Sequence, residues 1–116
     1  MKNFLDVVLD TNILVSALWS FDGNPARIVE MVLAGDITSH YSNEILAEYK
    51  KVLFRDRFKS RFAEGEINIL LDYIVKFGNR VSPAISKEPF FVDESDRIFY
   101  DVAKEVGAVL IIGNII

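Results

Sequence analysis

Cysteine is absent from the chain, which excludes disulfides and thiolate metal sites and is typical of a cytoplasmic protein. Histidine occurs only as His40, which we expect at a strand end on the surface, so zinc is disfavoured as a cofactor. No apolar run approaches the roughly 18–20 residues that a transmembrane helix needs. The N-terminus meets Asp6 too early for a signal peptide. We therefore expect no contact with a membrane.

Apolar side chains, in contrast, are abundant: they make up 51% of the 116 residues, and 12% of the residues are aromatic. This composition excludes a disordered chain, and the length suits one domain, residues 1–116, with a sizeable core. The net charge of −4 argues against a general nucleic-acid-binding surface. That argument weakens if several acids gather in one site and a cation neutralises them.

Short apolar runs alternate with helical patterns along the chain. We predict strands over residues 6–9, 37–41, 80–82 and 109–112, and helices over residues 12–19, 25–34, 43–53, 64–77 and 96–106. Asn24 and Ser42 are the expected N-caps of the second and third helices. Such alternation predicts right-handed crossovers and a parallel sheet covered by helices on both faces, with the last strand at its centre.

The spacing of apolar residues predicts which helix faces are buried. In helix 64–77 the expected inward residues are Ile67, Leu70, Leu71, Ile74 and Val75. In helix 96–106 they are Phe99, Ala103 and Val106.

Four acidic residues fall at strand ends or helix starts. Asp10 follows the first strand, Glu44 lies in the first turn of the third helix, and Asp93 and Asp96 flank the start of the last helix. Because ligands bind outside the carboxyl ends of parallel strands, we expect Asp10, Glu44 and Asp96 to converge on one pocket there. Like charges make such a cluster costly without a cation, and carboxylate oxygens select Mg²⁺ or Mn²⁺. The pattern therefore suits hydrolysis of a phosphodiester bond.

The same acids also have structural interpretations. Asp10 or Asn12 is equally well placed to cap the first helix, and Asp93 or Ser95 to cap the last one. Glu44 is favourable for the dipole of the third helix.

Two further acids are expected outside the site. Glu48 lies one turn beyond Glu44 on the same face, where we expect it in solvent. Asp101 lies roughly 140° round the last helix from Asp96, which directs it away from the pocket.

These residues resemble the PIN-domain family of metal-dependent ribonucleases over nearly the whole chain. The resembling stretches are residues 9–18, 23–26, 42–49, 93–103 and 111–114. Gly23-Asn24-Pro25-Ala26 and Ser42-Asn43-Glu44-Ile45-Leu46-Ala47-Glu48-Tyr49 are similar to a bacterial and archaeal branch regarded as toxin components of toxin–antitoxin systems. The resemblance implies an α/β fold, a three-layer α/β/α sandwich with a central parallel sheet.

The resemblance also implies a set of site residues. The acids of the family correspond to Asp10, Glu44 and Asp96, with Asp93 as an additional acid, and its fourth position corresponds to Asn114. Asp10 and Asp96 would bind Mg²⁺ or Mn²⁺, while Glu44 would hold the attacking water. The residues that would orient and support this site are Thr11, Asn12 and Asn114.

Two positions depart from the family pattern. Asn114 stands where many members have a fourth aspartate, and Ile112 stands where many have threonine or serine. Asparagine can ligate or orient water but adds no charge. Because the family usually continues past this point, we expect a chain that is truncated at its C-terminus or has lost its tail.

Residues 50–61 contain six basic residues and one acid, with phenylalanines interleaved at positions 54, 58 and 62. One interpretation is a helix end with aromatic residues in the core and cations in solvent. A second is a flank that contacts RNA phosphates through Arg55, Arg57 and Lys59. A third is a groove for a segment of the cognate antitoxin. Phe58, between two cations, is also the residue that we expect at a homodimer interface.

Three functions remain compatible with the sequence. The leading hypothesis is a Mg²⁺- or Mn²⁺-dependent endoribonuclease that acts as a toxin, with RNA as substrate and an antitoxin protein as partner. The second is a PIN-like module that binds RNA or protein without strong catalysis. The third is a receiver or phosphatase with a nucleophilic aspartate, which is disfavoured because no lysine-bearing strand end or Asp-x-Asp pair stands in the expected places.

Overall fold

A computed structural model describes residues 5–55, 61–85 and 94–113. The elements in chain order are β1 (Asp6–Leu9), α1 (Thr11–Trp19), α2 (Asn24–Leu33), β2 (Thr38–Tyr41), α3 (Asn43–Leu53), α4 (Glu64–Phe77), β3 (Asn79–Arg80), α5 (Glu94–Val106) and β4 (Val109–Ile111). These bounds lie within two residues of the predicted ones. Ser42 caps α3 as expected, accepting a hydrogen bond from the Ile45 N–H at 3.1 Å. Gly23 rather than Asn24 occupies the N-cap of α2.

The four strands form one sheet in the order β3-β2-β1-β4, and all neighbouring pairs are parallel. Val7 of β1 pairs with Ser39 on one side and with Val109 on the other. The prediction that the last strand is central is wrong for the described residues, in which β4 pairs only with β1. Because all strands run the same way, the residues that follow β1 and β2 lie at the same edge of the sheet as the first turn of α5.

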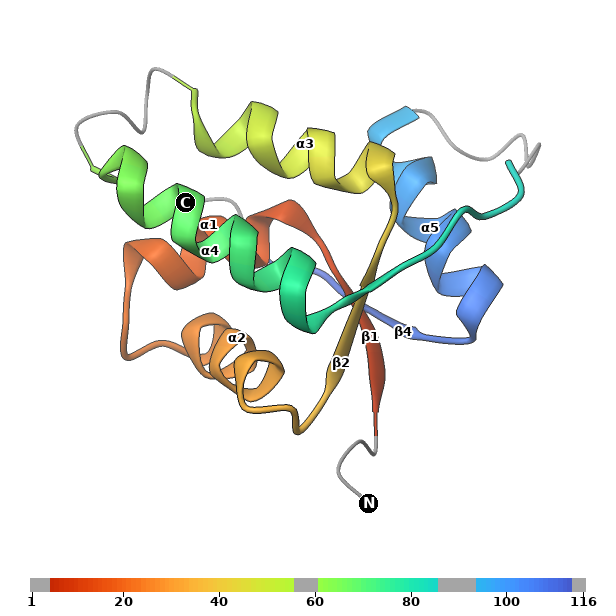
Figure 1. Cartoon of the computed structure of the whole chain (residues 1–116), viewed down its shortest axis with the longest axis horizontal. Coiled ribbons are helices and arrows are strands. Elements are labelled where there is room, and N and C mark those ends of the chain that lie inside the picture. Colours follow the sequence, from red (N-terminus) through yellow and green to blue (C-terminus); the bar gives the residue numbers. More distant parts are fainter. Residues whose placement is uncertain (1–4, 56–60, 86–93, 114–116) are drawn as a thin grey trace.

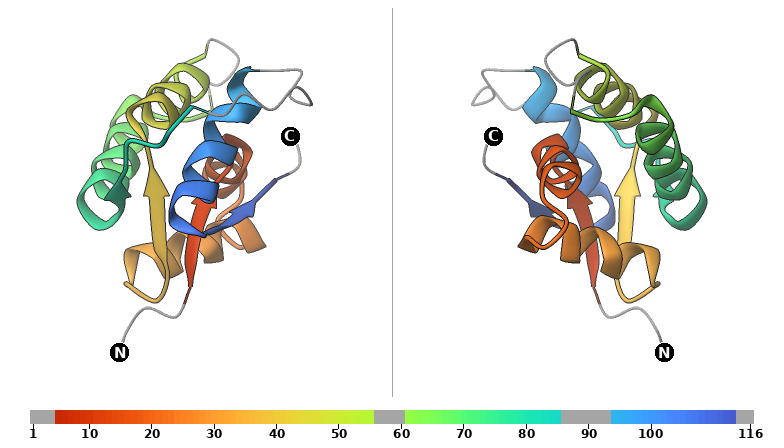
Figure 2. Two further views of the ribbon diagram at one scale, coloured as in Figure 1. Left: turned by 90° about the vertical axis from the view of Figure 1, so that its right-hand side faces the viewer. Right: turned by 90° about the vertical axis from the view of Figure 1, so that its left-hand side faces the viewer.

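Helices cover both faces of the sheet (Figure 1). The views in Figure 2 show α5 in front of the strands from one side, and α1 and α2 in front of them from the other. Helix α5 contacts β1, β2 and β4, while α3 lies beyond the carboxyl ends of the strands and contacts α1 and α5. The expected three-layer α/β/α sandwich with a central parallel sheet is confirmed. No helix among the described residues is long and apolar enough to cross a membrane.

The core is built on β1, whose Val7, Val8 and Leu9 are at most 1% exposed. Tyr49 of α3 is fully buried, and its hydroxyl donates a hydrogen bond to the Leu9 carbonyl at 2.6 Å. Burial raises the pKa of the Tyr49 hydroxyl above its usual range, so the group stays protonated and remains a donor. This bond holds α3 against the end of β1, next to Asp10.

Some predicted burial is wrong. Val75 of α4 is 38% exposed, because the buried stripe of that helix ends with Ile74. In α5, Phe99 is buried as expected and Ala103 packs against the core, whereas Val106 is only half-buried, and the buried Ile98 and Val102 were not predicted. Because α5 packs across β1, β2 and β4, the side of the helix that carries Val102 lies against the sheet.

His40 was expected on the surface, but only 7% of the residue is exposed. The pairing of β3 with β2 places Asn79 beside His40, so this part of β2 is covered. The Asn79 amide lies 3.0 Å from His40 Nδ1, and His40 Nε2 lies 2.9 Å from Asp6 Oδ1. The amide donates to Nδ1, so Nε2 carries the proton that Asp6 accepts.

Candidate active site

Asp10 stands where β1 turns into α1. Its backbone N–H donates to the Ile111 carbonyl at 2.9 Å, which continues the pairing of β1 with β4 by one residue. Asp10 occupies the N-cap position of α1 with extended backbone angles, yet its side chain makes no capping hydrogen bond. The backbone amides of Thr11 and Asn12, in the first turn of α1, nevertheless interact with the carboxylate and lower its pKa, so the capping interpretation stays open for Asp10.

Gly113 closes the site from the end of β4. A Cβ atom at this position would lie 3.1 Å from both the backbone nitrogen and Cδ1 of Ile13. The absence of a side chain therefore lets the chain pass directly over the first turn of α1. This close approach brings the Gly113 amide to the carboxylate of Asp10.

Opposing influences act on the charge of Asp10. Burial is the strongest influence, and it raises the pKa of the carboxyl group above its ordinary value. Hydrogen bonding from the backbone amides of Gly113, Thr11 and Asn12 lowers the pKa, and the negative charge of Asp96 raises it further. The net shift is upward, so the fold holds a carboxylate whose ionised form is disfavoured in the absence of a cation.

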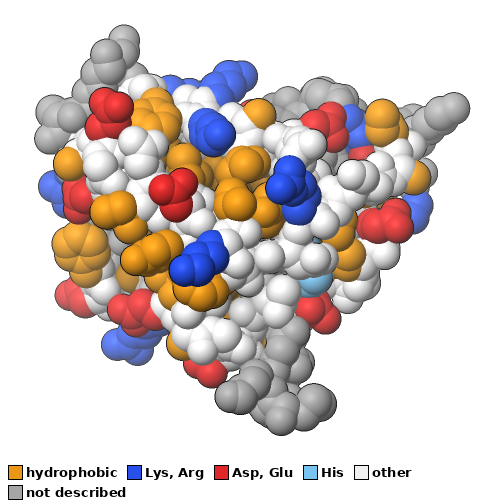
Figure 3. All heavy atoms as spheres, viewed as in Figure 1, with side chains coloured by type: hydrophobic (Ala, Val, Ile, Leu, Met, Phe, Trp, Pro, Cys, Tyr) orange, Lys and Arg blue, Asp and Glu red, His pale blue; other side chains and the backbone are white. Residues whose placement is uncertain are grey.

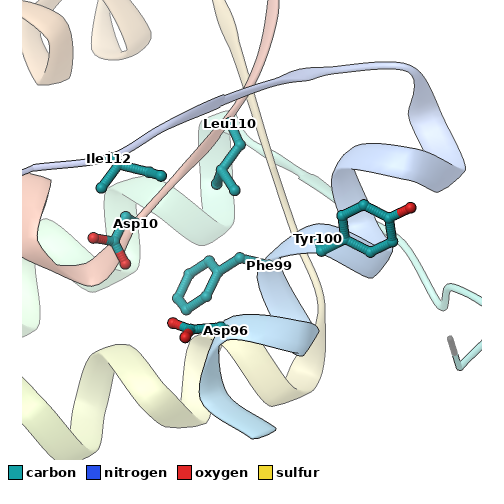
Figure 4. A pocket seen from close by; sticks show the side chains of 6 residues that line it. All are labelled: Asp10, Asp96, Phe99, Tyr100, Leu110 and Ile112. Carbon is teal, nitrogen blue, oxygen red and sulfur yellow. The ribbon is translucent and has the colours of Figure 1, made fainter. Parts of the chain in front are cut away.

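Asp10 and Asp96 line one pocket of about 300 Å³ (Figure 4), although Asp96 comes from the first turn of α5. The other lining residues are Phe99, Tyr100, Leu110 and Ile112. In the close view the two carboxylates lie at one end of the pocket and Tyr100 at the other, with the ring of Phe99 between them. The pocket is thus acidic at one end and apolar at the other.

Glu44 lies at the same edge of the sheet, in the first turn of α3, but it lines a different pocket, together with Ser42, Asn43, Val81, Ser82, Pro83 and Ile85. Its side chain is 55% exposed, and its carboxylate lies 4.0 Å from the Arg97 guanidinium. The structure therefore brings Asp10 and Asp96 together and leaves Glu44 apart, because the side chain turns toward Arg97.

Arg97 was missed by the sequence analysis. It is only 8% exposed, and its guanidinium forms an ion pair with Asp101, which is 4% exposed. The opposite charges four residues apart on one helix were a signal for this pair. Asp101 lies outside the pocket of Asp10, as expected.

Glu48 was expected in solvent, but it is half-buried, whereas Glu44 is exposed. Tyr49, the next residue, is tied to the end of β1, so this turn of α3 packs more closely than the first one.

The remaining predicted residues fall into two groups. Asn12 is half-buried, Thr11 is buried with a hydroxyl that has no partner among the described atoms, and Arg55 is exposed just beyond α3. The others lie outside the described residues: Asp93, Asn114, Arg57, Phe58 and Lys59.

The aromatic residues after α3 do not share one environment. Phe62 is 5% exposed and packs edge-on against Trp19, with ring centroids 6.0 Å apart. The Arg61 guanidinium lies 4.5 Å from the centroid of the Trp19 ring and donates to the Trp19 carbonyl at 2.9 Å. Phe54 is 38% exposed. Phe62 thus fits the interpretation of a core residue, and Arg61 is held against the protein.

The donor set can be tested against a cation. Among the described residues, no group of three or more acidic, histidine or cysteine side chains is placed to hold a metal ion. Mg²⁺, however, commonly keeps several waters and binds through one or two carboxylates. The pair of Asp10 and Asp96, with oxygen donors and a disfavoured charge on Asp10, therefore fits Mg²⁺ or Mn²⁺.

Comparisons with known proteins agree with this architecture. The profile of the PIN domain matches residues 6–114. Over 113 residues the chain is 30% identical to an uncharacterised protein of Methanocaldococcus jannaschii. The alignment covers 95% of this chain and 71% of that protein. The fold is similar to that of a chain in the crystal structure of VapBC2 from Rickettsia felis bound to a DNA fragment from their promoter. That match has a TM-score of 0.61 and 17% identity, and covers 95% of this chain and 89% of the other.

Proposed function

The chain belongs to the PIN-domain family, whose members are generally nucleases, and from this premise we propose that it is a Mg²⁺- or Mn²⁺-dependent endoribonuclease. The observation that carries the proposal is the pocket that Asp10 and Asp96 share at the carboxyl edge of the parallel sheet. Two acids from distant parts of the sequence line one space there.

Asp10 and Asp96 would hold the cation, with Asp93, Asn114, Asn12 and Thr11 as supporting residues. A bound divalent cation activates a water molecule and offsets the charge that develops on the phosphate. Asp10 is positioned by the β1–β4 pairing and by the close approach of Gly113. Asp96 is positioned by the packing of α5 on the sheet.

A glutamate of α3 completes the proposal as the group that holds the attacking water. Glu44 is the residue that the resemblance indicates, and a change of its side-chain rotamer is needed to move it away from Arg97. Glu48 is the better shielded of the two. Glu44→Gln and Glu48→Gln should therefore be compared, and the residue with this role should reduce the cleavage rate about 10²-fold or more.

We further propose that the nuclease acts as a toxin with a cognate antitoxin protein. The motifs at residues 23–26 and 42–49 support this role, and the shared fold with a chain of VapBC2 is in keeping with it. A second candidate is a PIN-like module that binds RNA or protein without cleavage. It is favoured by the finding that only two acids line the pocket in the described part of the chain.

The test is cleavage of a structured RNA with Mg²⁺, with Mn²⁺ and with a chelator. Asp10→Asn and Asp96→Asn should each lower the rate about 10²-fold or more, since each removes a charged ligand. Asp72→Asn, the same change at an exposed position of α4, should leave the rate unchanged. Cleavage that persists in the chelator or in Asp10→Asn would contradict the proposal, and RNA binding without any cleavage would favour the second candidate.

A further inference from the structure

The pocket of Asp10 and Asp96 contains more apolar than acidic side chains. Leu110 and Tyr100 are half-buried, Phe99 is 5% exposed, and Ile112, which lies beside Asp10 in Figure 4, is 72% exposed. Figure 4 shows the Tyr100 hydroxyl pointing away from the carboxylates, so that the ring rather than the polar atom faces the pocket. A site that bound only a phosphate and a cation would not need this apolar extension.

We propose that the apolar end of the pocket binds one unpaired nucleobase of the RNA substrate, next to the phosphodiester bond at the carboxylates. The inference rests on the proposed ribonuclease function and adds how the site holds the base of the nucleotide beside the scissile bond. The ribose and phosphate of a nucleotide are polar, and the faces of the base are its only extended apolar surface. The volume of about 300 Å³ lies at the lower end of the range for small-molecule pockets, which suits a single nucleotide.

The base must be unpaired because both faces of a paired base are covered by its neighbours in the duplex. Removing such a base from the stack costs a few kcal/mol, whereas a base in a loop or single strand is already accessible. The described lining residues other than the carboxylates offer aromatic and aliphatic carbon, so recognition depends on stacking and tolerates different bases.

A positive charge near the apolar end of the pocket suits the negatively charged backbone of an RNA strand. The Lys104 ammonium lies 5.9 Å from the centroid of the Tyr100 ring, which brings a positive charge to the side of the pocket remote from the carboxylates. A phosphate that flanks the bound base would be attracted there, while the phosphate at the acidic end is accommodated with the cation.

Binding without cleavage tests the subsite directly. A single-stranded RNA that contains one 2-aminopurine is titrated with the Asp10→Asn protein, and quenching of the 2-aminopurine fluorescence reports stacking. Adding Tyr100→Ala should weaken binding about tenfold and abolish most of the quenching, because one base–aromatic stack is lost. Tyr100→Phe keeps the ring and should leave both unchanged. Phe21→Ala is the control, since Phe21 is an aromatic residue that is 75% exposed and lies outside the pocket.

A second variant covers the case in which Tyr100→Ala fails to fold. Tyr100→Leu keeps an apolar side chain at this half-buried position, so the fold should tolerate it, and the binding of the RNA should weaken several-fold because the aromatic ring is lost. Affinity and quenching that match those of the Phe21→Ala control in both variants would overturn the subsite.

Cleavage by the wild-type protein separates this inference from the proposed function. Replacing one nucleotide by an abasic residue should slow cleavage at the neighbouring bond about tenfold, and a continuous duplex should resist cleavage. Normal cleavage of the abasic RNA would refute the subsite and leave the nuclease intact. Quenching without cleavage of any RNA would support the subsite and refute the nuclease.

Discussion

At the scale of single residues, Asp10 is a carboxylate in a setting that opposes its charge. Burial and the charge of Asp96 raise its pKa, and the lowering by the amides of Gly113, Thr11 and Asn12 does not compensate fully. A carboxyl group whose folded pKa lies above its ordinary value costs stability when it is ionised. A bound cation would reverse that cost, which is why the electrostatics of Asp10 connect the fold to the proposed function.

Asp10→Asn should stabilise the cation-free protein at neutral pH. Because the folded pKa is raised, the folded state binds the proton more tightly. The cost is absent below the ordinary value of 3.8, grows as pH rises through the folded pKa and is complete above it. The gain should be on the order of 0.5 kcal/mol or less, since the group is only partly buried. Urea denaturation in a chelator across the acid range measures it. A loss of stability at neutral pH would be inconsistent with this description.

The buried pair of Arg97 and Asp101 should contribute far more to stability than the exposed contact with Glu44. Asp101→Asn removes the buried carboxylate that pairs with the Arg97 guanidinium, for a cost of about 3–5 kcal/mol in the free energy of unfolding. Glu44→Gln is the control and should cost less than about 1 kcal/mol, because Glu44 is exposed and its carboxylate is 4.0 Å away. Urea titrations measure the free energy of unfolding of both variants. Equal losses of stability would show that Asp101 is not the main ion partner of Arg97.

At the scale of elements, the site depends on how closely the end of β4 approaches the start of α1. Gly113 permits that approach, and it brings a backbone amide to the carboxylate of Asp10. The sheet pairing alone ends at Leu9 and Ile111. The position of Asp10 therefore depends on the close approach of Gly113 to α1 as well as on the pairing of β1 with β4.

Gly113→Ala should disturb both the fold and the site. The added Cβ would lie 3.1 Å from the Ile13 backbone, which forces the end of β4 away from α1 at a cost of about 1–3 kcal/mol. Gly65→Ala is the control: it meets no atom within 4 Å and lies inside α4, so it should be neutral or slightly stabilising. Thermal unfolding compares the two. Equal melting temperatures for Gly113→Ala and wild type would show that the end of β4 can move without cost.

The elements also show what the sequence can predict. Alternating patterns predicted every helix and strand in the described residues, because hydrophobic periodicity is local. Asp10 and Asp96 were found because their positions at a strand end and a helix start determine which edge they reach. The direction of Glu44 was not predictable, since it depends on Arg97 from a different helix. The burial of His40 likewise depends on its partner strand.

At the scale of the whole molecule, the face seen in Figure 3 carries apolar side chains that lie between charged ones. Helix α4 crosses this face, and its outward residues Ile69, Tyr73 and Phe77 recur every four positions with exposed fractions of 56%, 43% and 47%. The Tyr73 and Phe77 rings pack against each other with centroids 5.8 Å apart. Contiguous apolar surface of this kind commonly marks a protein contact.

We expect a homodimer that uses the outward face of α4. Ile69→Lys should convert the dimer to a monomer, because it places a charge in an apolar contact, while the free energy of unfolding of the monomer should change by less than about 0.5 kcal/mol. Asn68→Lys adds the same charge at the neighbouring exposed position and should weaken the dimer less. Light scattering at high protein concentration measures the mass. A wild-type monomer, or a dimer that survives Ile69→Lys, would refute this interface.

The central claim is that Asp10 and Asp96 form one cation site, and calorimetric titration with Mn²⁺ tests it most directly. Wild-type protein should bind the ion in the pocket that these two carboxylates share. Asp10→Asn and Asp96→Asn should each weaken binding at least about tenfold, because each removes a charged oxygen ligand. The variant that carries both changes should show no binding beyond the loss of this one site. The affinity of Asp72→Asn for Mn²⁺ should equal that of the wild type. Equal affinity of wild type and Asp96→Asn for Mn²⁺ would contradict the account.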